Sequence, residues 1–126
     1  MSKQFDEATI TASLREQGAK FAYVFGSRAD SEVVRINSDF DVAAHWGGKN
    51  PNSWEINLPD DVDLVVLDSA PLWIAGRVAV TGRLLFDDDP PARVAWQADT
   101  GCMYLDELPA LRERQREWRE AVARGR

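Results

Sequence analysis

Apolar and polar residues recur along the chain with two different spacings, which separate helices from strands. Residues 6–18 place Ile10 and Leu14 on one stripe and stop at Gly18, so they predict a helix. Apolar runs predict strands at residues 21–25, around 39–44 and at 62–67, the last of them buried. The rest of the pattern predicts a helix over residues 71–81 closed by Gly82, a short strand over 83–86, and helical sequence from 92 onward, broken or bent near 106–109.

The segment between residues 45 and 59 is rich in Gly, Asn and Pro, so it is predicted to be a polar loop or a hairpin connection. It carries Trp46 and Trp54, which need a surface to pack on. Asp68 is interpreted as the N-cap of the helix that Pro71 begins. Together the elements predict an α/β (α+β) fold, with a small mixed β-sheet flanked by helices and a helical C-terminal segment.

Length, charge and cysteine content narrow the class of protein. The 126 residues suit a single domain spanning 1–126, with a core over about 5–90 and the C-terminal helical segment over about 92–124. A net charge of −6 argues against a non-specific nucleic-acid binder and favours a basic protein partner. The single cysteine, Cys102, suggests a buried thiol in a reducing compartment. No apolar stretch indicates a membrane span or a secretion signal, so a cytoplasmic location is expected.

Two short motifs carry the candidate chemistry. Gly26-Ser27 ends an apolar strand, and a turn of this kind can present backbone N–H groups and a hydroxyl to phosphate oxygens. Asp39-Phe40-Asp41 follows after eleven intervening residues, and side chains at i and i+2 of a strand share one face. Paired carboxylates of this kind suit Mg²⁺. Asp63, on a later strand, is the candidate for a third carboxylate.

Each signal also has a structural interpretation. A Gly-Ser turn can simply cap a helix, an Asp-x-Asp pair is common at strand ends, and Asp63 can be a solvated acid beside Asp60 and Asp61. Their order, with strands between them, favours the phosphate and metal interpretation.

The segments 25–30, 38–42 and 62–65 together resemble the minimal nucleotidyltransferase (MNT) family of the polymerase-β-type superfamily, many of whose members are antitoxins paired with a HEPN-domain ribonuclease toxin. Gly82-Arg83-Leu84-Leu85-Phe86 resembles the family's "G-x-L-L-[FY]" strand. The resemblance implies that Gly26 and Ser27 bind a nucleoside triphosphate and that Asp39, Asp41 and Asp63 hold metal, with two Mg²⁺ ions expected. The spacing of eleven residues, usually ten, and Asp30-Ser31 in place of a glycine or arginine depart from the family pattern.

Two further residues and one helix have alternative interpretations. Arg28 can neutralise a phosphate, as a nucleotide-binding residue, or pair with Asp30 or Glu32. His45 is interpreted as a strand-end histidine rather than a ligand or base. A mostly apolar stripe with three-four spacing covers residues 108–122 and consists of Leu108, Leu111, Gln115, Trp118 and Val122. This stripe is expected to pack on its own domain. It can also dock a partner protein, with Trp96 or Trp118 as an anchor.

The resemblance implies an enzyme that transfers AMP from ATP to a hydroxyl, expected to be a tyrosine, of a partner HEPN toxin. No direct contact with nucleic acid or membrane is expected. The main alternative is a degenerate member that neutralises or scaffolds a partner by binding only; transfer to a small molecule is a weaker one. Base preference, the number of nucleotides added, the acceptor and the oligomeric state are left open.

Overall fold

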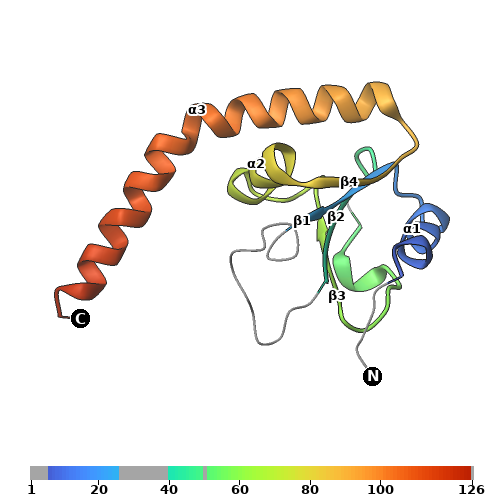
Figure 1. Cartoon of the computed structure of the whole chain (residues 1–126), viewed down its shortest axis with the longest axis horizontal. Coiled ribbons are helices and arrows are strands. Elements are labelled where there is room, and N and C mark those ends of the chain that lie inside the picture. The colour runs from blue at the N-terminus through green and yellow to red at the C-terminus, as the bar shows by residue number, and fades with distance from the viewer. Residues whose placement is uncertain (1–5, 26–39, 50, 126) are drawn as a thin grey trace.

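A computed structural model describes residues 6–25, 40–49 and 51–125. In chain order its elements are α1 (Glu7–Glu16), β1 (Phe21–Phe25), β2 (Phe40–His45), the short 3-10 helix η2 (Ser53–Glu55), β3 (Val62–Val66), α2 (Leu72–Thr81), β4 (Arg83–Asp87) and α3 (Pro90–Ala123). Figure 1 shows a sheet with α1 beside it and with α2 and α3 together on another side. The mixed α/β architecture predicted from the sequence is confirmed.

The four strands lie in the order β3-β2-β1-β4. β1 is antiparallel to both β2 and β4, whereas β2 and β3 are parallel. Because a hairpin joins antiparallel strands, the hairpin option for residues 45–59 is wrong, and this segment is a crossover that carries η2.

Apolar side chains fill both faces of the sheet. On one face, Ile10 and Leu14 of α1 are fully buried against alternate residues of β1 and β2. The first helix is fixed at its start by the Asp6 carboxylate, which accepts hydrogen bonds from the Ala8 backbone N–H at 3.1 Å and the Thr9 hydroxyl at 2.7 Å. On the other face, Phe21 and Tyr23 pack under α2 and α3.

β3 is an edge strand of the described sheet and not the buried strand that the sequence predicted. Val62 and Val66 are buried, but Asp63 is exposed and Leu64 and Val65 are only partly covered. Only one side of this strand has a hydrogen-bonded neighbour in the described sheet. The apolar residues of β3 are therefore only in part covered by other residues.

Asp68 does not cap α2, contrary to the sequence interpretation. Its carboxylate accepts hydrogen bonds from the backbone N–H groups of Trp46 and Gly48, both at 2.8 Å. Pro71 occupies the N-cap position of α2 without a side-chain hydrogen bond. Asp68 therefore stabilises the turn after β2, where two N–H groups need acceptors.

The two tryptophans of the 45–59 segment differ sharply. Trp46 is 2% exposed and donates its indole N–H to the Gln17 carbonyl at 2.9 Å, so it found the expected packing surface. Trp54 is 80% exposed, so for this residue the expectation was wrong.

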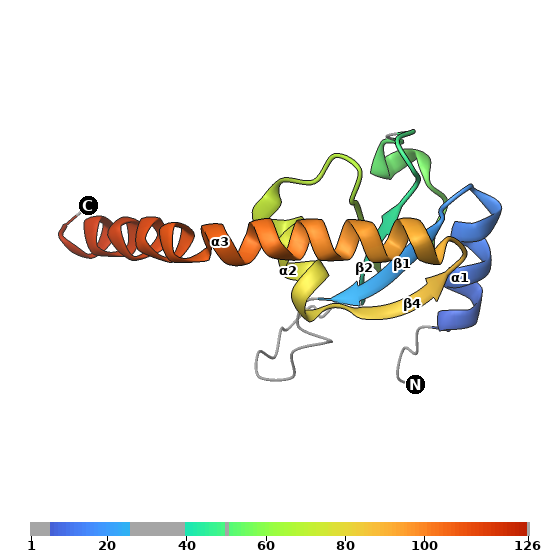
Figure 2. The same ribbon diagram turned by 90° about the horizontal axis from the view of Figure 1, so that it is seen from above.

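α3 is a continuous helix of 34 residues with Pro109 inside it. Figures 1 and 2 show that its first half lies across α2 and the sheet and that its second half extends away from the domain, and Figure 1 shows the bend between the two halves. A proline removes one backbone hydrogen bond and bends a helix, which explains the predicted bend.

The second half of α3 was expected to pack on its own domain, but it does not. We call residues 110–123 the α3 arm; Trp118 on it is 67% exposed and Val122 is 48% exposed. Cys102, on the first half, is exposed rather than buried as predicted. Among the described helices, none is long and apolar enough to cross a membrane.

Candidate functional site

Asp41 and Asp63 lie side by side on neighbouring strands. The parallel register of β2 and β3 pairs their Cα atoms directly. Neighbouring strands are about 4.8 Å apart, and paired residues point to the same face of the sheet. The structure therefore brings together two of the three carboxylates proposed from the sequence.

The two acids differ in their exposure to solvent. Asp41 is 8% exposed and lies between Phe25 of β1 and Asp63, whereas Asp63 is exposed at the sheet edge. Two carboxylates in this arrangement repel each other, and a bound cation would relieve that repulsion. Their hard oxygen atoms are the donors that Mg²⁺ prefers.

The described residues supply only part of a metal site. They contain no group of three or more His, Cys, Asp or Glu side chains that could hold a metal ion. Asp39, the third proposed carboxylate, lies outside the described residues, as do Gly26, Ser27 and Arg28. Phe25, which immediately precedes Gly26, is paired with Asp41. The Gly-Ser motif thus begins at the end of β1 that adjoins the carboxylate pair.

His45 lies at the opposite end of β2, about 13 Å along the strand from Asp41. Its ring stacks on Phe21 with centroids 4.9 Å apart, and its Nδ1 accepts a hydrogen bond from the Gly47 N–H at 3.1 Å. These contacts agree with the interpretation of a strand-end histidine that has a structural role.

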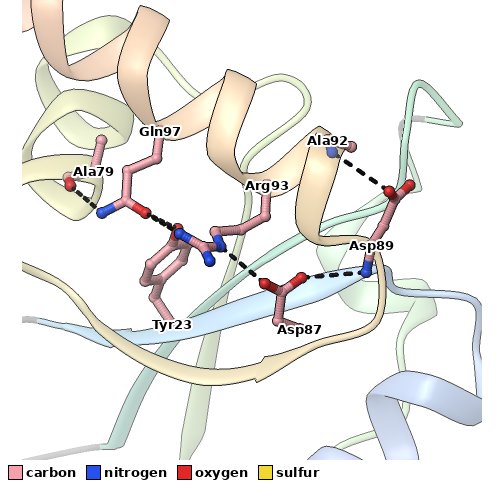
Figure 3. Close-up of polar contacts among 7 residues, drawn as sticks. All are labelled: Tyr23, Ala79, Asp87, Asp89, Ala92, Arg93 and Gln97. Carbon is pink, nitrogen blue, oxygen red and sulfur yellow. Dashed lines mark hydrogen bonds and ion pairs between the residues drawn. The ribbon is translucent and has the colours of Figure 1, made fainter.

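A polar network fastens α3 to the sheet and to α2, as Figure 3 shows. The Tyr23 hydroxyl donates to Gln97 Oε1 at 2.8 Å, and Gln97 Nε2 donates to the Ala79 carbonyl at 2.9 Å. Arg93 donates to Asp87 at 2.9 Å and to the same Gln97 oxygen at 3.1 Å. Burial raises the pKa of Tyr23 to about 12, so the hydroxyl keeps the proton that it donates.

A groove runs beside Asp63, along the outer edge of β3. It has a volume of about 450 Å³ next to Asp63, and a second hollow of about 290 Å³ continues it along the strand. The groove did not follow from the sequence, because the exposure of a strand edge depends on which strands pair, and the spacing of residues along one segment does not show that. Trp54, an unexplained tryptophan in a polar segment, was the one signal of it.

Comparison with known families gives one match. The family model for polymerase beta nucleotidyltransferases matches residues 8–91, which is more than half of the chain. The match runs from α1 into the first turn of α3 and includes the Gly-Ser motif and all three proposed carboxylates. The chain belongs to the polymerase-β nucleotidyltransferase family.

Solved structures agree with this assignment and with the predicted fold of the nucleotidyltransferase. A chain of a toxin–antitoxin crystal structure with AMP-PNP is 29% identical, with a TM-score of 0.70 over 94% of this chain and 99% of that one. A chain of the MntA–HepT toxin–antitoxin structure is 28% identical, with a TM-score of 0.65 over 92% and 96% of the two chains.

A third similar structure is a re-refined complex of a tri-AMPylated HEPN toxin from Shewanella oneidensis with MNT antitoxin. The matching chain is 27% identical, with a TM-score of 0.65 over 92% of this nucleotidyltransferase and 95% of that chain. The comparison with curated proteins gave no match. The solved structures confirm the resemblance to the MNT group that the sequence motifs indicated.

Proposed function

We propose that this nucleotidyltransferase is an antitoxin that transfers AMP from ATP to the hydroxyl of a tyrosine on a partner HEPN toxin. The observation that carries the proposal is the register that pairs Asp41 with Asp63 at the sheet end where Gly26-Ser27 begins. The similar structures support it, since one contains AMP-PNP and another an AMPylated HEPN toxin. We also propose that the chain forms a single domain and that it acts in the cytoplasm.

The transfer is a substitution at the α-phosphorus of ATP. The acceptor oxygen forms the new P–O bond, and the bond to the oxygen that bridges the α- and β-phosphates breaks, so that its electron pair leaves with pyrophosphate. The hydroxyl proton passes to a carboxylate, for which Asp63, the exposed member of the pair, is the candidate, and then to water.

The chain's own residues have three tasks in this reaction. Gly26 and Ser27 would bind the triphosphate, with Arg28 able to pair with a phosphate oxygen. Asp39, Asp41 and Asp63 would hold two Mg²⁺ ions, which when bound supply charge neutralisation and activate the attacking oxygen. The strand pairing holds the two described carboxylates in a fixed relation, so little reorganisation is needed on binding.

The partner needs a docking surface, and we propose the α3 arm for that task. It extends away from the domain (Figures 1 and 2) and exposes Trp118 and Val122. A groove of about 580 Å³ lies between Trp73 of α2 and the arm residues Leu111 and Trp118. The same exposed arm favours the alternative function, neutralisation of a partner by binding only.

Intact-mass spectrometry of the co-purified partner separates these functions. With Mg²⁺ and ATP, we expect the partner's mass to increase by one or more AMP units; UTP, CTP and GTP tested separately define the base preference. The variants Asp41→Asn and Asp63→Asn should each slow the transfer by at least about 100-fold.

Asp99→Asn is the control, since Asp99 is an exposed acid on α3, outside the strand pair, and it should transfer at the wild-type rate. Transfer at the wild-type rate by Asp41→Asn and Asp63→Asn would show that the carboxylate assignment is wrong. A stable complex with no mass change under any nucleotide would favour the binding-only function.

A further inference from the structure

The groove along β3 is a continuous surface with one aromatic side chain at its centre. We call its two hollows together the β3 groove; both are lined by Ser53, Trp54 and Leu64. The hollow beside Asp63 also contains Ile56, Leu58, Pro59, Asp60 and Val62. The groove therefore leads from the proposed catalytic carboxylate along the outer edge of the sheet.

The wall that carries Trp54 is held in place. Asn52 and Glu55 close a capping box around η2, in which the Asn52 N–H donates to Glu55 Oε1 at 2.9 Å. The side chain of Gln17, the C-cap of α1, makes two hydrogen bonds to the backbone of Asn57, at 2.8 and 3.0 Å. Trp54 is thus 80% exposed on a segment fixed at both sides, and a large apolar side chain presented in this way is typical of a binding surface.

The position of the groove distinguishes the two substrates. Across the end of the sheet, Phe25 on β1, Asp41 on β2 and Asp63 on β3 are paired in that order. The Gly-Ser motif follows Phe25, so the proposed triphosphate grip begins on the β1 side of Asp41. The β3 groove lies on the opposite side, beyond Asp63. A ligand there would lie on the far side of the carboxylate pair from the end of β1, which suits an acceptor better than the triphosphate.

The charge of the groove indicates what kind of acceptor it fits. Asp60 and Asp63 line it, and no Lys, Arg or His is among its lining residues in the described part of the chain. A nucleic-acid acceptor would bring phosphate charges against these acids, whereas a segment with Lys or Arg would be attracted. β3 is also an edge strand of the described sheet, and an extended chain can add at such a position.

We infer that the β3 groove binds the acceptor, a basic and extended segment of the partner protein that carries the hydroxyl nucleophile. This inference rests on the proposed function, which it deepens. Trp54 packs against the side chains that flank the hydroxyl, while Asp63 at the end of the groove faces the hydroxyl itself. Trp54 is accordingly a residue that determines acceptor specificity and is separate from the nucleotide site.

A binding experiment with peptides tests the inference without requiring transfer. The probe is a fluorescein-labelled peptide with a central tyrosine and two arginines on each side, compared with the same peptide carrying glutamates. We expect the basic peptide to bind the wild-type chain at least tenfold more tightly than the acidic one. Trp54→Ala should weaken that binding at least tenfold, Trp54→Phe should restore most of it, and the affinity for AMP-PNP with Mg²⁺ should stay within twofold.

Leu105→Ala is the control, because Leu105 is also an exposed large apolar residue, at 54%, but lies on the first half of α3 and does not line the β3 groove. It should bind the peptide as the wild type does. Equal binding by Trp54→Ala and Leu105→Ala, or of the basic and acidic peptides, would overturn the inference. Loss of AMP-PNP affinity in Trp54→Ala would assign the groove to the nucleotide instead. A chain that binds the basic peptide but transfers no AMP would contradict the proposed function alone.

Discussion

The carboxylate pair depends on a single feature, the register of β2 against β3. Asp63 alternates with Val62 and Leu64, which face the opposite layer of the core with α1. A slip of one residue would turn Asp63 to that layer and place Val62 or Leu64 beside Asp41. The burial of Val62 and Leu64 fixes the register and therefore also fixes the position of Asp63 beside Asp41. A substitution that disturbs the core packing of β3 would also disturb the carboxylate pair.

The hydroxyl of Tyr23 gives a prediction for alkaline pH. Its pKa is raised from 10.0 to about 12 in the folded chain, mainly by burial, so the folded state holds a proton that the unfolded chain releases between these values. Its contribution to stability is therefore complete below about pH 10 and is lost as the pH rises toward 12. Tyr23→Phe, which lacks the hydrogen bond to Gln97, should cost about 1 kcal/mol at neutral pH.

Urea unfolding followed by tryptophan fluorescence measures this effect, since the Trp96 ring is 5.7 Å from the rings of both Phe21 and Tyr23. The difference in unfolding free energy between wild type and Tyr23→Phe should shrink between about pH 8 and pH 11. A constant difference across that range would mean that Tyr23 titrates in the folded chain as it does in the unfolded one.

At the scale of single residues, the sequence predicted a residue's position correctly where the signal is local. It predicted wrongly where the hydrogen-bond partners are far away along the chain. Asp41 and Asp63 were proposed correctly as strand residues, because alternation along a strand is local. Asp68 was assigned to the wrong helix cap, because its partners Trp46 and Gly48 are 22 and 20 residues away. Its short side chain suits either role, and only the crossover of the chain brings the two N–H groups to it.

The packing of α2 on α3 depends on a close approach at Gly76. An added Cβ there would overlap the side chain of Tyr104, whereas one at Gly101 would meet its nearest neighbour, Val80, at 3.8 Å. Both glycines lie inside helices, where replacement by alanine alone favours the helix by up to about 1 kcal/mol. We expect Gly76→Ala to destabilise the fold by about 2 kcal/mol because the helices must separate.

Gly101→Ala is the control for helix propensity and should be neutral or up to about 1 kcal/mol more stable than wild type. Urea denaturation of the two variants makes the comparison. If both variants gain stability, the close packing of the two helices at Gly76 is not required.

At the scale of elements, the helices and strands followed from the sequence to within a residue or two, since apolar spacing and glycine stops are local signals. The order of the strands did not follow from the sequence. For that reason β3 was predicted to be buried, and the groove beside it was not predicted. Strand order and edge exposure are set by contacts between distant segments, which spacing along one segment cannot show.

The whole molecule consists of a compact sheet domain and a helical arm that leaves it. A helix of 34 residues is about 51 Å long, which exceeds what the four-stranded sheet can cover. The network around Gln97 and the contact at Gly76 fix the first half of α3, and the bend near Pro109 directs the second half away from the domain (Figure 1). Trp118 and Val122 of the arm are thereby left exposed, and the docking of a partner on this helix stays a prediction.

A substitution at Trp118 tests the arm as a docking surface. Trp118 is 67% exposed, so Trp118→Glu should change the free energy of unfolding by less than about 0.5 kcal/mol. If the partner packs on the arm, burying a glutamate in place of a tryptophan should weaken the complex by about 2 kcal/mol or more, roughly 30-fold in Kd. Isothermal titration calorimetry with the co-purified partner measures this affinity.

Val94→Glu is the control for the same chemical change on α3, because Val94 is 52% exposed on the half that lies along the domain. It should leave the affinity unchanged, so a loss confined to Trp118→Glu identifies the arm rather than the helix as the docking surface. Equal affinities for the two variants would place the partner elsewhere. In that case the acceptor segment in the β3 groove would have to supply the binding energy, and Trp54→Ala would then weaken the whole complex.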